Sequence, residues 1–108
     1  MIDTQAFYAH FGTSQPLGAD EQLLLFDHVR VSCTSSSMTA IFESRAADER
    51  NMTALFAVSG LYEGCLPFLT RSGNVALQLK SEVDHDESEL ALACLNEALS
   101  NLDIWTDQ

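Results

Sequence analysis

Basic residues are scarce in this chain of 108 residues. Five lysines and arginines stand against 16 aspartates and glutamates, which gives a formal net charge of −11. Such an acidic surface repels phosphate backbones and anionic lipid headgroups, because both carry negative charge. We therefore expect neither nucleic acid nor a membrane as a partner. The same charge is also consistent with a surface that only keeps the protein soluble.

Long hydrophobic runs and targeting signals are missing as well. No apolar stretch reaches the roughly 18 residues that a membrane span needs. The first ten residues lack the basic region and apolar run of a signal peptide. We therefore expect a cytoplasmic protein. The length suits one domain over 1–108, and a hydrophobic content of 46% is enough for one core.

Cysteines are few and are not patterned. Cys33, Cys65 and Cys94 include no CxxC pair, which is the spacing typical of zinc sites and of thioredoxin-like redox motifs. Three buried, reduced thiols are the usual state for such residues in a cytoplasmic protein. The sequence predicts no metal and no disulfide.

A catalytic constellation is also absent. His10, His28 and His85 belong to no Ser/His/Asp or Cys/His arrangement. The acidic run at 84–87 lacks the alternating oxygen ligands and central glycine of a calcium loop, and no glycine-rich phosphate loop is present. We therefore expect no cofactor and no enzyme activity. Binding of another protein is the function class that remains.

What is present begins with a short helix, predicted over 5–11 with Asp3 or Thr4 as its N-cap. Phe7 and Phe11 lie four residues apart and share one face. A helix this short does not persist alone in water, so we expect it to dock on a larger element.

The middle of the chain shows the apolar and polar alternation of β-strands. Val75, Leu77 and Leu79 give the best example. Pro67 has no backbone donor, so its strand is expected at an edge or with a bulge. Antiparallel strands are predicted over 21–33, 38–44, 52–59, 65–70 and 75–83, with a loop over 14–18 and turns at 34–37 and 71–74.

The segment 52–59 has two interpretations. Its sequence MTALF is a near-copy of MTAIF at 38–42, which favours a second strand and a hairpin between the two copies. Its apolar residues also share one helical face, so a helix over 51–63 is the alternative. We take the strand as the prediction.

The last predicted element is an amphipathic helix. Asp86 is the expected N-cap, with Glu89 as its reciprocal partner in a capping box. Together these elements predict an α+β two-layer fold, in which a sheet of about five antiparallel strands packs on the C-terminal helix and a short helix precedes it. The apolar stripe of the helix comprises Leu92, Leu95, Leu99 and Leu102, widened by Ala91, Ala98 and Trp105.

Apolar residues remain that one helix cannot cover. Residues 23–26 are consecutive and apolar, so a strand presents some of them on its second face. A partner protein, a second copy or a bound peptide is expected there, unless the N-terminal helix forms a third layer. The predicted partner-binding residues are Leu24, Phe26, Leu61 and Phe68.

Three segments carry a resemblance to a known family. They are LLLFD at 23–27, LTRSGNVALQ at 69–78 and the terminal LDIW at 102–105. In this order they resemble the class I chaperones of bacterial type III secretion, the Tir-chaperone-like family. The resemblance implies a small acidic cytoplasmic homodimer that binds the N-terminal segment of a secreted effector in extended form and keeps it secretion-competent. It implies a role in virulence.

Two features depart from the family pattern. Members are usually longer, and they usually have a helix between the third and fourth strands, where this sequence predicts a strand. The competing hypothesis is an acidic inhibitor or nucleic-acid mimic that blocks a basic groove on a partner enzyme. That class predicts carboxylates spread over one surface with few exposed apolar residues.

Overall fold

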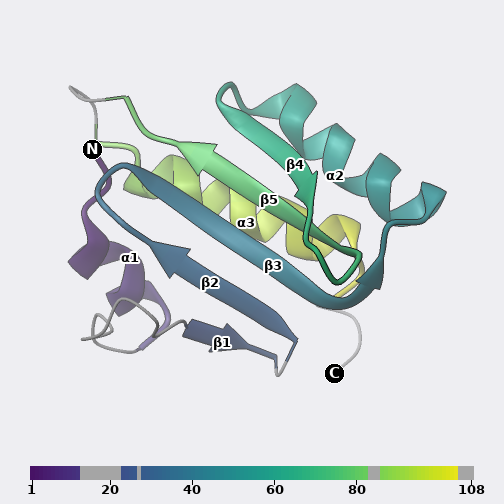
Figure 1. Ribbon diagram of the computed structural model, residues 1–108. Helices are drawn as coiled ribbons and strands as arrows, with labels where there is room; N and C mark the ends of the chain where they lie inside the picture. Colours follow the sequence, from purple (N-terminus) through teal and green to yellow (C-terminus); the bar gives the residue numbers. More distant parts are fainter. Residues whose placement is uncertain (13–22, 27, 83–85, 105–108) are drawn as a thin grey trace.

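The computed structural model places one antiparallel sheet against a layer of helices (Figure 1). It describes residues 1–12, 23–26, 28–82 and 86–104. The predicted loop over 14–18, the end of the predicted strand at Val83, and Trp105 lie outside these residues. The elements in chain order are α1 (Thr4–His10), β1 (Leu23–Leu25), β2 (Val29–Cys33), β3 (Ser37–Ala46), α2 (Glu49–Leu61), β4 (Cys65–Leu69), β5 (Asn74–Lys80) and α3 (Ser88–Asn101).

Within these residues the sheet has five strands in the order β1-β2-β3-β5-β4, and every neighbouring pair is antiparallel. Two tight hairpins, β2–β3 and β4–β5, meet along the central β3–β5 pair. Helix α2 connects β3 to β4, which lies at the far edge of the sheet. The predicted α+β fold with about five antiparallel strands, a short N-terminal helix and a C-terminal helix is confirmed.

The predicted single strand over 21–33 is wrong, because it contains a turn. The His28 N–H donates to the Leu25 carbonyl at 3.0 Å, and residues 26–28 separate β1 from β2. Phe26 occupies this turn with φ of 53°. Positive φ is common in the short connections that join antiparallel strands.

The predicted strand over 52–59 is also wrong, and the alternative helix is correct. Asp48 caps α2 by accepting from the Asn51 N–H at 2.8 Å, and the Asn51 side chain donates to the Ala46 carbonyl at 2.9 Å. These contacts satisfy backbone hydrogen-bonding groups at the start of the helix and at the end of β3. The two MTA(I/L)F copies therefore differ because only the second one follows a capping aspartate.

The helices form a single layer on one face of the sheet. Helix α3 buries Leu95 and Leu99 against the strands, and Asn101 of α3 donates to the Ala54 carbonyl of α2 at 3.2 Å. Helix α1 packs beside α3 and buries Phe7 and Tyr8. The N-terminal helix therefore does not form a third layer, and none of the helices in the described part of the chain lies on the opposite face of the sheet (Figure 1).

The start of α3 differs from the predicted capping box. The helix begins at Ser88, and Asp86 lies one position before the N-cap residue Glu87. The Asp86 carboxylate accepts from the Ser88 hydroxyl and N–H at 2.7 and 3.0 Å, and these two bonds lower its pKa. The Ser88 oxygen in turn accepts from the Asp3 N–H at 2.9 Å, so it ties α3 to the start of α1. Among the described residues, no helix is long and apolar enough to cross a membrane.

A candidate protein-binding face on the sheet

The strand register builds one row of side chains across the helix-free face. Leu24 pairs with Arg30, Arg30 with Ile41, Ile41 with Ala76, and Ala76 with Phe68. Directly paired residues point to the same face of a sheet. We call these five residues the cross-strand row. On β2, β3 and β5 their chain neighbours point the other way, into the helix-covered core.

The cross-strand row is apolar at both ends. Leu24 is 49% exposed on edge strand β1, and Phe68 is 38% exposed on edge strand β4. Ile41 is partly exposed between them, and Ala76 is buried. Four strand spacings of about 4.8 Å separate the two ends by roughly 19 Å.

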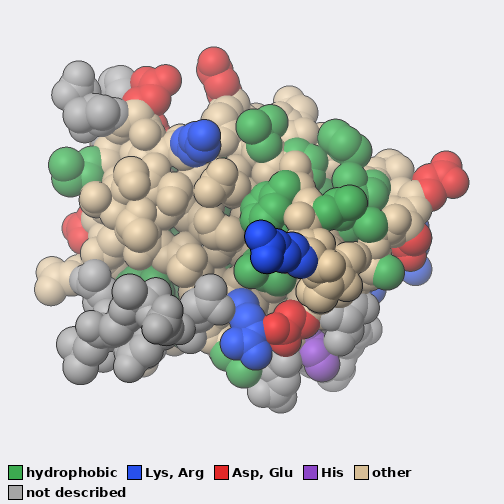
Figure 2. All heavy atoms as spheres, viewed as in Figure 1, with side chains coloured by type: hydrophobic (Ala, Val, Ile, Leu, Met, Phe, Trp, Pro, Cys, Tyr) green, Lys and Arg blue, Asp and Glu red, His purple; other side chains and the backbone are tan. Residues whose placement is uncertain are grey.

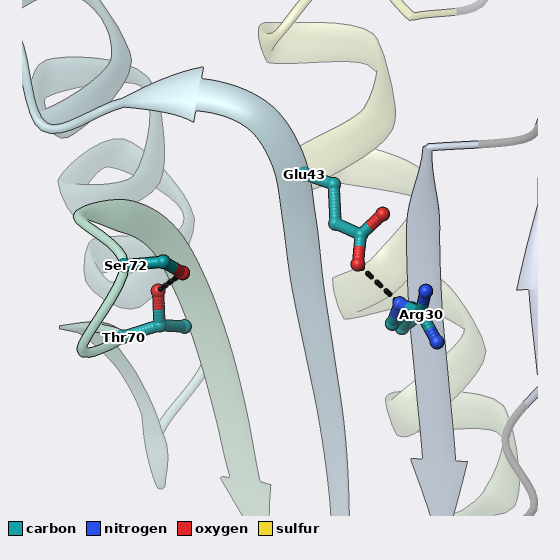
Figure 3. Close-up of polar contacts among 4 residues, drawn as sticks. All are labelled: Arg30, Glu43, Thr70 and Ser72. Atoms are coloured by element: carbon teal, nitrogen blue, oxygen red, sulfur yellow. Dashed lines mark hydrogen bonds and ion pairs between the residues drawn. The ribbon is translucent and has the colours of Figure 1, made fainter.

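The middle of the row is held by an ion pair. The Arg30 side chain on β2 bonds the Glu43 carboxylate on β3, as Figure 3 shows. This contact fixes the guanidinium beside the row and leaves its aliphatic stem on the face. On the far side of the face, Thr70 and Ser72 bond each other within the β4–β5 turn at 3.0 Å (Figure 3).

A second row lies beside the first and is mostly polar. Ser32 pairs with Thr39, Thr39 with Gln78, and Gln78 with Leu66. Leu66 ends this row and is 64% exposed. Hydroxyl and amide groups therefore line the apolar row, and they supply donors and acceptors to anything laid across the face.

Phe26 lies at the β1 edge, next to Leu24. It is exposed and has a left-handed backbone conformation. A bulky residue with positive φ is uncommon, and it costs roughly 1–2 kcal/mol relative to the right-handed region. Strain of this kind is often found where a side chain must be presented for function.

Neither edge of the sheet offers a long row of backbone groups. The bonds from Lys80 N–H to the Gly64 carbonyl and from Thr70 N–H to the Asn74 carbonyl show which residues of β4 direct their backbone groups toward β5. In this alternation the Pro67 nitrogen points away from β5, so the outer edge of the sheet lacks one hydrogen-bond donor. The predicted edge position of this strand is confirmed.

At the other edge, β1 has only three residues. The Tyr8 hydroxyl occupies the neighbouring edge of β2, because it accepts from the Cys33 N–H at 2.9 Å and bonds the Cys33 carbonyl at 3.4 Å. Burial of this hydroxyl raises the pKa of Tyr8. Recognition by this face therefore depends on side chains more than on added strands.

A second apolar surface adjoins β4. Phe56 and Leu61 on α2 are 57% and 63% exposed, and Leu69 at the end of β4 is also exposed. We call these three residues the α2 patch. Figure 2 shows hydrophobic side chains gathered over β4 and α2. From 51 to 70 the chain has one charged residue, Glu63, although the whole molecule has a net charge of −11.

The sheet differs in charge from the rest of the molecule. The five strands contain Arg30, Arg45 and Lys80 but only one acidic residue, Glu43. The other acidic residues that the structure describes lie in helices, turns and connections. The helix-free face is therefore not the source of the net negative charge.

The structure separates the predicted partner-binding residues. Leu24 and Phe68 are the two ends of the cross-strand row, Phe26 flanks the first end, and Leu61 belongs to the α2 patch instead. Two residues of these surfaces were not predicted. Phe56 is exposed because its segment is helical, and Ile41 joins the row only through the strand register, which the sequence does not show.

The described residues contain no group of histidine, cysteine or carboxylate side chains that could hold a metal ion. Two hollows on their surface are lined mostly by Glu63, Lys80, Glu82 and Glu87 in one case and by Met1, Glu82 and serines of the turns in the other. No protein-family model, curated protein or solved structure matches this chain.

Proposed function

We propose that this protein is a small acidic cytoplasmic chaperone that holds a client segment in extended form without acting on it chemically. The client is the N-terminal segment of a type III secretion effector, which the bound state keeps secretion-competent. The cross-strand row carries this proposal, because it offers two apolar anchor points on a face that none of the three described helices covers.

The spacing of the anchors suits an extended chain. The roughly 19 Å between Leu24 and Phe68 corresponds to about six residues at 3.3 Å each. Apolar client side chains at the two ends would each contribute roughly 1.5–3 kcal/mol when buried. The polar row of Ser32, Thr39 and Gln78 would pair with the client backbone between them.

The order of elements supports the family resemblance. The resemblance implies a helix between the third and fourth strands, and α2 occupies that position. A strand over 52–59 would have left the chain without this helix, so the observed α2 removes one of its two differences from the family. The shorter chain remains a difference from the family.

We also propose that two copies associate through the α2 patch. Molecules with a net charge of −11 repel each other, so association needs a surface without charge. The stretch from 51 to 70 meets this need, and depletion of charged residues is typical of the centres of interfaces. Pairing by β4 edges is disfavoured because Pro67 lacks the N–H that such pairing would use.

The test uses one client, identified by native co-purification and mass spectrometry. A peptide of its bound segment is titrated against wild type, Phe68→Ser and the control Gln5→Ser, which changes an exposed residue of α1. We expect Phe68→Ser to raise the dissociation rate about tenfold or more, because an apolar anchor is lost. Gln5→Ser should match wild type. Higher salt should slow association and leave most of the affinity intact.

The competing inhibitor hypothesis gives the opposite pattern. A nucleic-acid mimic binds through its carboxylates, so its affinity falls steeply with salt and tolerates loss of Phe68. The sheet face does not favour this hypothesis, since its strands contain three basic residues and one acidic residue. If the measured affinity follows salt alone, the chaperone proposal is wrong.

A further inference from the structure

The cross-strand row contains one charged side chain, Arg30. It pairs with Leu24 on one side and with Ile41 on the other, so it lies between two apolar members of the row. The side chain is 50% exposed, and its bond to the Glu43 carboxylate uses the Nε–H alone. Among the residues that the structure describes, Glu43 is the only hydrogen-bond partner of this guanidinium. Four N–H donors on the two terminal nitrogens therefore remain for a ligand.

A client segment laid along the row covers these donors. Covering them removes their water, and a charged donor that loses water without gaining an acceptor is costly. A carboxylate suits the planar guanidinium best, because it can accept two parallel charge-assisted bonds from the terminal nitrogens. A client that is apolar throughout therefore binds this part of the face poorly.

We propose that Arg30 recognises one acidic residue of the client, while Glu43 holds the guanidinium in position through Nε. The inference rests on the proposed function, because it names a feature of the segment that the cross-strand row binds. The local charge supports it, since the five strands contain three basic residues and one acidic residue. Glu43 already offsets part of the charge of Arg30, so the expected preference for an acidic residue is moderate.

The strand spacing gives the position of the acidic residue. In an extended client, side chains that face the sheet recur about every 6.6 Å, which is two residues. If one apolar side chain contacts Leu24, the next inward side chain reaches the space between Arg30 and Ile41, which lie roughly 4.8 and 9.6 Å along the row. The sixth residue reaches Phe68. The client therefore has two apolar residues six positions apart, with an aspartate or glutamate two positions from one of them.

The net charge of the molecule makes the opposite demand on every other client position. A charge of −11 repels acidic residues at long range, wherever they stand in the segment. Long-range charge alone would therefore select against acidic residues at all positions. A preference for an acidic residue at one position, within an otherwise neutral or basic segment, has the local contact with Arg30 as its cause.

The test selects random heptapeptides displayed on phage against the immobilised full chain. Wild type is compared with Arg30→Gln, Phe68→Ser and the control Arg50→Gln, which removes the same charge from an arginine of α2 that is also paired with an acidic residue, Asp103. Wild type and Arg50→Gln should select the apolar pair with the acidic residue beside it. Arg30→Gln should select the apolar pair without the acidic residue. It should still fold, because the lost ion pair is an exposed one.

A titration gives the size of the effect without depending on a variant. The synthetic peptide selected most often by wild type is compared with the same peptide carrying glutamine or asparagine in place of its acidic residue. We expect the amide peptide to bind wild type about fivefold more weakly or worse, because a charge-assisted contact becomes a neutral one. Arg30→Lys should show a smaller difference between the two peptides, since lysine retains the charge and loses the planar fork.

The outcomes separate this inference from the proposed function. If wild type and Arg30→Gln select the same residues beside an apolar pair that disappears in Phe68→Ser, the inference is wrong and the proposed function stands. Equal affinities of the acidic and amide peptides for wild type would also overturn the inference. If wild type selects no apolar pair, both the inference and the proposed function are wrong.

Discussion

Phe26 combines an exposed aromatic ring with a backbone conformation that β-carbons disfavour. Replacing it by alanine or by glycine removes the ring in both cases. Glycine accepts positive φ without strain, so we expect Phe26→Gly to be more stable than Phe26→Ala by about 1 kcal/mol. Thermal denaturation should show a difference of about 5 °C.

This order is the reverse of the usual one, because glycine within a strand normally costs roughly 0.5–1 kcal/mol relative to alanine. Both variants should weaken client binding equally if the ring is the contact. A more stable alanine variant would mean that the turn in solution does not hold Phe26 in the left-handed region.

The core of α3 gives a second prediction. Leu99 is fully buried, so Leu99→Asp places an unpaired carboxylate in the apolar core at a cost of several kcal/mol. The whole stability of such a domain is roughly 5–15 kcal/mol. We expect this variant to be unfolded by circular dichroism.

The matched change at the start of the same helix is Glu87→Gln. The Glu87 side chain accepts from the Glu82 N–H at 3.1 Å, and glutamine retains an acceptor oxygen there. The melting temperature should change little, because only a favourable charge at the helix start is lost. Equal melting temperatures for Leu99→Asp and wild type would show that the buried face of α3 is misassigned.

At the scale of elements, the spacing of apolar residues predicted the strands and helices that bury one face. Strand β5 and helix α3 each bury one face, so their apolar residues repeat with the period of the element. Helix α2 was mispredicted because its inward face is narrow and it exposes Phe56 and Leu61. Its apolar residues therefore fit a strand as well as a helix. The N-cap residue Asp48 is the sequence feature that distinguishes a helix from a strand in this segment.

The candidate site was only partly predictable for a related reason. Leu24 and Phe68 were recognisable as apolar residues near strand edges. Their relation across the sheet depends on the register and on the position of β5 between β3 and β4. These are long-range properties, which no local pattern in the sequence contains. Leu61 was grouped with them because a strand over 52–59 would place it in a short connection near the sheet edge, whereas it is the last residue of α2.

At the scale of the whole molecule, association of two copies is the clearest prediction. We expect light scattering to give about twice the chain mass of 11.9 kDa at high micromolar concentration. Leu61→Asp should shift the protein to the monomer, because it adds charge to the α2 patch without removing a buried side chain.

The control is Gln5→Asp, which adds the same charge at an exposed position of α1. This variant should remain a dimer and fold normally, since an acidic residue in the first turn suits the helix dipole. A monomeric mass for wild type would contradict the dimer proposal. Dissociation by Gln5→Asp as well would mean that total charge, and not the α2 patch, controls association.

The strand order also determines how the chain assembles in time. The β2–β3 and β4–β5 pairs are joined by short turns, so each forms with little loss of chain entropy. The β3–β5 pair joins them and must enclose α2 together with β4. We therefore expect the two local hairpins to form first and then to dock through the β3–β5 pair. The docking step is the slow one, because it is the contact most distant in sequence within the sheet.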